Sequence, residues 1–223
     1  MSSNYTRLPL LSEFYHQYLV DQDSSAFTGK VLEKYTLGTL ERLAASADRM
    51  TRRAAVLTLG MVAGYESNHS LGQALHDDDR GVRLLADNAI RSLWCRQGAP
   101  DERRHLALII RLNSTKRYEE AVRQATILIE RSPSFAEVWN QRAIASFALN
   151  EFQRSIRDCR QALELNPYHF GAASGMGQCY LQLGQRSEAL ESFRQALELN
   201  PNLEGVRAQV QYLQRTEKRS GLE

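Results

Sequence analysis

The 223-residue chain has little of what marks several large classes of protein. It contains five prolines and only three cysteines, Cys95, Cys159 and Cys179, none of them in a CxxC pair. So sparse a set argues against a disulfide framework and against a zinc site. Because all three lie in stretches with helical apolar spacing, we expect buried, reduced thiols and a cytoplasmic protein.

Other absences narrow the range of functions. No apolar run approaches the roughly 20 residues of a membrane span, and the first residues do not resemble a signal peptide. The formal net charge is only +2, so we expect neither nucleic acid nor a membrane as a partner. The sequence also has no glycine-rich phosphate loop, no GxSxG and no HExxH. We therefore predict no catalytic residues, no cofactor and no enzymatic activity.

What the sequence does contain is a repeat. The octapeptide Arg-Gln-Ala-Leu-Glu-Leu-Asn-Pro occurs at Arg160–Pro167 and again 34 positions later, at Arg194–Pro201. One further step back reaches Pro133. A fixed period of this length indicates an array of stacked helical hairpins, which works by presenting a surface.

The residues inside each period carry a family resemblance. Trp139 matches an opening aromatic position, and the third unit matches six more positions, at Gly177, Tyr180, Ala189, Phe193, Ala196 and Pro201. This half of the chain resembles the tetratricopeptide repeat family. The resemblance implies three repeats over about 102–135, 136–169 and 170–203. It also leads us to expect an amphipathic helix over about 203–218 that caps the array.

A looser repeat, offset by 31 positions, precedes the array. It pairs Arg52 with Arg83 and Ala55 with Ala86, and the pattern Asp-x-x-x-x-Val-Arg-x-x-Ala resembles HEAT repeats. We expect two such repeats in residues 1–98, behind an N-terminal helix within 1–28, and the tetratricopeptide array in 99–223. The predicted fold is therefore all-α, a right-handed α-α superhelix of HEAT-like and then tetratricopeptide hairpins.

Two clusters of side chains are candidate binding or catalytic sites. His69, His76 and the acids Asp77–Asp79 are metal-ligand types, but consecutive acids in a turn point in different directions. We expect a solvated turn that caps the next helix, and no bound metal. A second cluster is a row of arginines on one helix, at Arg154, Arg157 and Arg160. Because Asp158 and Glu164 dilute its charge, we expect a solvated helix face.

The family resemblance implies that the first helix of each hairpin lines a concave groove. The groove residues carried over in this way are Arg103, Leu106, Ile110, Asn140, Gln141, Ile144, Phe147, Ser174, Gln178 and Leu181. Such a neutral, amide-rich and partly apolar lining suits an extended segment or a docked helix. It lacks the basic residues with which some family members clamp a carboxylate.

The leading hypothesis is a non-catalytic scaffold or adaptor that binds a protein or peptide partner in this groove. One alternative is an enzyme accessory, since some HEAT-like proteins resemble chromophore lyases or their chaperones, with His76–Asp79 as its site. The other alternative is a structural module that associates with itself as a homo-oligomer.

Overall fold

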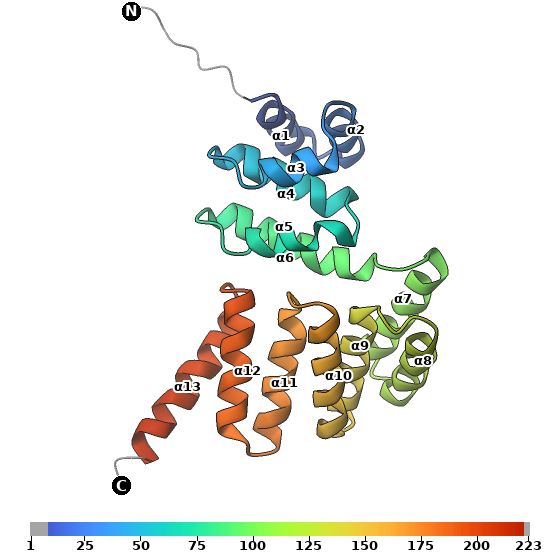
Figure 1. Cartoon of the computed structure of the whole chain (residues 1–223), viewed down its shortest axis with the longest axis vertical. Helices are drawn as coiled ribbons and strands as arrows, with labels where there is room; N and C mark the ends of the chain where they lie inside the picture. The colour runs from blue at the N-terminus through green and yellow to red at the C-terminus, as the bar shows by residue number, and fades with distance from the viewer. Residues whose placement is uncertain (1–8, 221–223) are drawn as a thin grey trace, which may run out of the picture. The chain divides into compact units, whose positions relative to one another are not determined.

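The computed structural model describes residues 9–220, with side chains up to residue 216. Within these residues the chain forms thirteen α-helices and one 3₁₀ turn, and no strand (Figure 1). The predicted all-α fold is confirmed. The chain divides into two compact units between Leu93 and Trp94. None of the helices in the described part is long and apolar enough to cross a membrane.

The first unit is built from six helices. They are α1 (Leu10–Asp21), α2 (Ser24–Lys34), α3 (Leu37–Leu43), α4 (Arg49–Val62), α5 (Asn68–Ala74) and α6 (Arg80–Cys95), with the 3₁₀ turn η1 (Tyr65–Ser67) before α5. Helix α1 falls inside the segment predicted for an N-terminal helix and packs against α2 and α4. The Phe27 ring of α2 lies 5.0 Å from Tyr18 and 6.5 Å from Tyr15, both on α1. These aromatic contacts join the first two helices.

The looser repeat of the sequence reappears in the geometry of this unit. Helices α4 and α6 begin one such offset apart, at Arg49 and Arg80. The residue before each helix accepts a backbone N–H as a cap: Asp48 from Thr51 at 2.7 Å and Asp79 from Val82 at 2.9 Å. Arg52 and Arg83 each donate Nη1 to two carbonyls of the preceding turn. The two helices therefore begin with the same capping and arginine–carbonyl hydrogen bonds. The HEAT family assignment stays a prediction.

The second unit is an array of hairpins. Its helices are α7 (Pro100–Ser114), α8 (Tyr118–Arg131), α9 (Ala136–Ala148), α10 (Phe152–Leu165), α11 (Phe170–Gln182), α12 (Arg186–Leu199) and α13 (Glu204–Ser220). Helices α8, α10 and α12 begin at equal intervals of one repeat, and so do α9, α11 and α13. Helices α9 to α12 run antiparallel, side by side (Figure 1). The expected capping helix is α13, which covers α12 with Val206, Val210 and Leu213.

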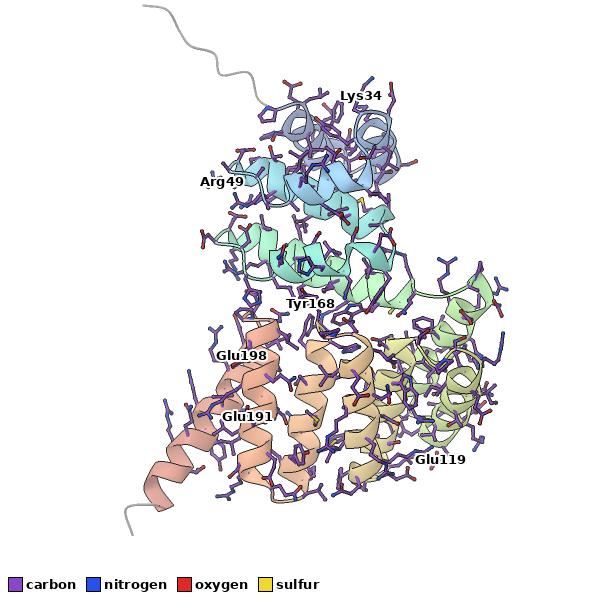
Figure 2. All side chains as sticks on the ribbon, viewed as in Figure 1. Lys34, Arg49, Glu119, Tyr168, Glu191 and Glu198 are labelled. Carbon is purple, nitrogen blue, oxygen red and sulfur yellow. The ribbon has the colours of Figure 1, made fainter. Side chains whose placement is uncertain are left out.

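Both turns of the repeat have a local cause. Inside each hairpin one residue adopts a left-handed backbone, Lys116, Asn150 or Gly184, with φ of 61°, 61° and 73°. These residues stand one repeat apart and each directly follows the helix C-cap, where this conformation ends a helix. Between hairpins, the buried Asn166 accepts the backbone N–H of Tyr168 through Oδ1 at 3.1 Å, and Asn200 does the same for Asn202. Tyr168 lies at the α10–α11 turn (Figure 2).

The two helices of a hairpin touch where one side chain is missing. A Cβ atom placed on Gly177 in α11 would lie 2.6 Å from ring carbons of Phe193 in α12. The Phe193 ring is fully buried, so it has no room to move aside. The packing of this hairpin therefore requires a glycine at position 177, which is also one of the positions that match the tetratricopeptide repeat.

We predict that Gly177→Leu destabilises the second unit by overpacking, by about 1–3 kcal/mol or more. The measurement is the free energy of unfolding from denaturant titration of the full chain. Gly205→Leu is the matched control, because Gly205 lies in α13 with open space around its Cβ position. Equal stability of the two variants would contradict the alignment of the repeats.

Candidate functional site

The ten residues predicted to line the groove lie on α7, α9 and α11, the first helices of three successive hairpins. Their exposure divides them into three groups. Arg103 and Ile144 are exposed, with Ile144 at 44%. Six are half-buried, namely Ile110, Gln141, Phe147, Ser174, Gln178 and Leu181. The other two, Leu106 and Asn140, are buried.

The prediction is wrong for these two buried residues. Leu106 is 1% exposed and shares the core-facing side of α7 with Ile109 and Leu112. Asn140 is 8% exposed, and its Nδ2 donates to Glu137 Oε1 at 3.2 Å. Neither side chain is available to a partner, so the accessible lining has one apolar residue and one amide fewer than the sequence indicated.

A buried carboxylate organises the polar side of α9. Glu137 Oε1 accepts from Asn140 and, at 2.7 Å, from Nε2 of Gln141. The other oxygen, Oε2, accepts from Nε2 of His169 at 2.9 Å. Asn113 of α7 extends the network by donating Nδ2 to the side-chain and backbone oxygens of Gln141, both at 2.9 Å. The network therefore links α7 and α9 to the turn before α11.

His169 has a fixed place and a fixed tautomer. Its Nδ1 accepts the backbone N–H of Ala172 at 3.1 Å, which caps α11. The proton of the neutral ring is therefore on Nε2, the atom that donates to Glu137. The indole of Trp94, at the start of the second unit, stacks on the imidazole with centroids 4.3 Å apart and lies 5.0 Å from Phe170. With both ring nitrogens engaged and 1% exposure, this histidine serves structure rather than catalysis.

Two opposing effects act on the pKa of Glu137. Burial raises the pKa of this carboxyl, but the hydrogen bonds from His169, Gln141 and Asn140 lower it further than burial raises it. The net pKa lies below the usual value, so the group is ionised near neutral pH. Neither Glu137 nor His169 was singled out from the sequence. The available signal was the repeat itself, since Glu137 aligns with Gly171 and Gly205.

We predict that His169→Ala destabilises the second unit by about 3–5 kcal/mol, because it leaves a buried carboxylate short of a donor. It also removes the cap of α11. Glu137→Gln, which keeps a hydrogen-bonding group of the same shape, is expected to cost less. The measurement is a double-mutant cycle of unfolding free energies for the two positions. Additive effects would contradict a direct Glu137–His169 interaction.

The acidic turn before α6 caps the helix as predicted, but two of its acids are not solvated. Asp77 forms a two-fold ion pair with Arg52 at 2.6 and 2.8 Å, and Asp79 forms one with Arg53 at 2.7 Å for both bonds. Their side chains are only 10% and 15% exposed. Among the described residues no group of three His, Cys, Asp or Glu could hold a metal. Two of the three carboxylates that an enzyme-accessory role would use are thus occupied by arginines.

The Asp79–Arg53 pair makes the first unit sensitive to acid. The hydrogen bonds from Arg53 lower the pKa of Asp79 from 3.8 to about 2, against the opposing effect of burial. Because this pKa is lower in the folded state, the stabilisation is complete above the ordinary pKa and is lost as the pH falls through 2. We predict that Asp79→Asn costs about 1–2 kcal/mol at pH 7 and much less at pH 2.

The measurement for Asp79 is thermal unfolding of the full chain at both pH values. Asp78→Asn is the control in the same turn, because Asp78 is exposed and carries none of these ion pairs. A cost of Asp79→Asn that does not change with pH would show that the lowered pKa is not the origin of the effect.

The three cysteines are free thiols. Cys159 and Cys179 are buried as expected, whereas Cys95 is only half-buried. Burial raises the pKa of the Cys95 thiol to about 11 and raises the pKa of the other two as well. All three therefore stay protonated near neutral pH, which makes them poor nucleophiles.

With this geometry in place, comparison with known proteins identifies the repeats. Residues 136–169 and 172–203 match the tetratricopeptide repeat family. They correspond to the second and third repeats expected from the sequence, so α9 to α12 form two tetratricopeptide repeats. A TPR repeat-containing protein of Rhizobium etli is 43% identical over 44 residues. That match covers 20% of this chain and 22% of the relative.

Solved structures show the same architecture. The first TPR of Spaghetti (RPAP3), bound to an HSP90 peptide, superposes with a TM-score of 0.50 at 23% identity and covers 52% of this chain and 93% of that one. The Sgt2 TPR domain of Aspergillus fumigatus gives 0.53 at 16% identity, covering 56% and 84%. The translocator chaperone SycD of Yersinia enterocolitica gives 0.52 at 14%, covering 54% and 96%. At these identities the likeness concerns the fold.

Proposed function

We propose that this protein is a non-catalytic adaptor whose tetratricopeptide array binds a protein or peptide partner along the first helices of its hairpins. The observation that carries the proposal is an apolar set at the surface of the predicted groove. Ile144 is 44% exposed on α9, although Ala143 and Ala145 on either side of it are buried. Phe147 on α9, Leu181 on α11 and Ile110 on α7 are half-buried and belong to the same groove set.

The polar groups of this surface suit a peptide. Arg103, Ser174 and Gln178 keep part of their surface in water, and they can hydrogen-bond to a peptide backbone or to its side chains. Apolar anchors with a few polar groups are the usual composition of a groove that takes an extended segment or a helix. The Spaghetti repeat was solved with the peptide SRMEEVD, so an array of this architecture can hold a peptide.

The exposed apolar side chains of the groove provide the test of this proposal. We predict that Ile144→Asp abolishes capture of the partner, because it places a charge where an apolar side chain is desolvated on binding. Ile127→Asp is the matched control, since Ile127 has almost the same exposure, 46%, but lies on α8, a second helix. Both variants, checked for folding by circular dichroism, are used to capture proteins from native lysate for quantitative mass spectrometry.

A protein recovered with the wild type and with Ile127→Asp but lost with Ile144→Asp is the expected result. Equal recovery with all three would contradict binding along the first helices and would turn attention to the second helices or to the first unit.

A further inference from the structure

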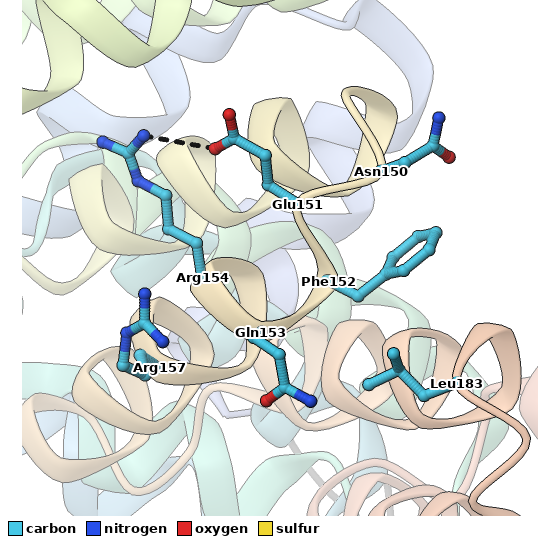
Figure 3. Close-up of a pocket in the computed structure, with 7 residues that line it drawn as sticks. All are labelled: Asn150, Glu151, Phe152, Gln153, Arg154, Arg157 and Leu183. Carbon is cyan, nitrogen blue, oxygen red and sulfur yellow. Dashed lines mark hydrogen bonds and ion pairs between the residues drawn. The ribbon is translucent and has the colours of Figure 1, made fainter.

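A second surface feature of the array lies away from the predicted groove. It is an open hollow between the start of α10 and the end of α11, with a volume of about 410 Å³. Phe152 and Leu183 supply its apolar surface, beside the amide of Gln153 (Figure 3). Leu183 is 36% exposed although it directly follows a helix that packs in the core. An apolar patch at this point can be covered by a partner.

The rim of the pocket is basic. Arg154 donates to Glu151 at 3.2 Å, and these side chains are 34% and 45% exposed. Arg157 is exposed on the next turn of α10 and, in the described part of the chain, forms no ion pair. Figure 3 shows both arginines on the side of the pocket away from Leu183. The lining thus carries two cations against one carboxylate.

Asp158, one of the two acids expected to dilute this charge, does not do so. Asp158 follows Arg157 in the sequence, but it is 3% exposed. It forms a two-fold ion pair with Arg142 of α9, at 2.8 Å for both bonds. The sequence-based expectation of charge dilution by Asp158 is therefore wrong, because the residue points into the hairpin. Arg157 keeps an unbalanced positive charge at the surface.

The corresponding positions of the next repeat have the opposite sign. One period further along the chain, Arg154 and Arg157 correspond to Glu188 and Glu191. Both line a neighbouring pocket of about 410 Å³ in which Arg160 donates to the hydroxyl of Tyr180 at 2.6 Å. The first repeat has Glu120 and Arg123 at these positions, so the second repeat alone has an arginine at both, and this pair of charges does not follow from the repeat architecture.

We propose that this pocket is a second docking site, for an acidic segment of a protein partner that carries a large apolar side chain next to its carboxylates. The apolar side chain covers Phe152 and Leu183, and a neighbouring carboxylate pairs with Arg157. Exposed ion pairs are individually weak, so the apolar contact supplies much of the affinity, and the charge selects the partner. This site combines the start of α10, a second helix, with the residue that follows α11, a first helix, and none of its lining residues belongs to the predicted groove.

The test uses a fluorescent peptide with both ends blocked, Glu-Asp-Leu-Phe-Asp-Glu, and fluorescence anisotropy with the full chain. Two control peptides separate the contributions: Gln-Asn-Leu-Phe-Asn-Gln has no charge, and Glu-Asp-Ser-Ser-Asp-Glu has no apolar residue. The wild type is expected to bind the first peptide and to bind both controls more weakly. Affinity for the first peptide is expected to fall as salt is raised.

Arg157→Glu is expected to weaken binding of the acidic apolar peptide about fivefold or more, because attraction becomes repulsion. Arg123→Glu is the matched control: Arg123 is exposed on α8 at the same position one repeat earlier, and its replacement changes the net charge equally. This control is expected to leave the affinity within about twofold. Leu183→Ser is expected to weaken binding while leaving the salt dependence in place.

Three results would overturn the inference: no binding by the wild type, equal affinity of Arg157→Glu and Arg123→Glu, or equal binding of the uncharged peptide. Ile144→Asp separates this site from the groove. If Ile144→Asp abolishes peptide binding and Arg157→Glu does not, the peptide lies in the groove, and only the second site is refuted. If partner capture fails while this peptide binds through Arg157, the groove proposal alone fails.

Discussion

The array depends on one constraint: a hairpin of two amphipathic helices has more apolar surface than it can bury alone. Each hairpin must therefore cover the next, and the covering helix must come close. Within the third hairpin, α11 and α12 come so close at Gly177 that a Cβ atom there would lie 2.6 Å from the buried Phe193 ring. A left-handed residue, Lys116, Asn150 or Gly184, stands at the turn inside each hairpin, where this conformation ends a helix. The last hairpin is covered by α13, so the same rule explains the cap.

The stacking of the hairpins also explains why some polar side chains of the first helices form hydrogen bonds within the fold. A carboxylate at Glu137 is buried when the turn before α11 closes over it, so it must be given donors there. Those donors are an imidazole and two amides rather than a lysine or arginine. Amides that would otherwise have hydrogen-bonded to a peptide are thereby used internally. The groove residues that keep part of their surface in water and form none of these internal bonds are the apolar Ile110, Ile144, Phe147 and Leu181 and the polar Arg103, Ser174 and Gln178. Apolar anchors with a few polar groups are therefore expected to carry the recognition.

Features that recur in every repeat could be predicted from the sequence, whereas side-chain interactions that occur only once could not. The repeats expected from the period begin at about 136 and 170, where α9 and α11 begin, because equivalent positions meet the same surroundings. The acidic turn Asp77–Asp79 was expected to cap the next helix, and Asp79 does so. Aligning equivalent positions of the repeats does not show which side chain of another helix a residue contacts. The pairs Glu137–His169 and Asp158–Arg142 could therefore not be expected from the sequence. Leu106 was misplaced for the same reason, because a family column gives a helical position but not the local packing that buries it.

Positions whose residue differs from one repeat to the next therefore give each repeat its own surface. On the second helices the column that begins at Arg123 continues with Arg157 and then Glu191, so its sign changes along the array. These exposed positions do not contribute to the core, and the fold tolerates either charge there. On the first helices the equivalent freedom is smaller, because Asn113, Asn140 and Gln141 form internal hydrogen bonds. Specificity that rests on charge can thus vary on the second-helix face without a change in packing, whereas specificity on the first-helix face combines the spacing of apolar side chains with the few polar groups that stay accessible.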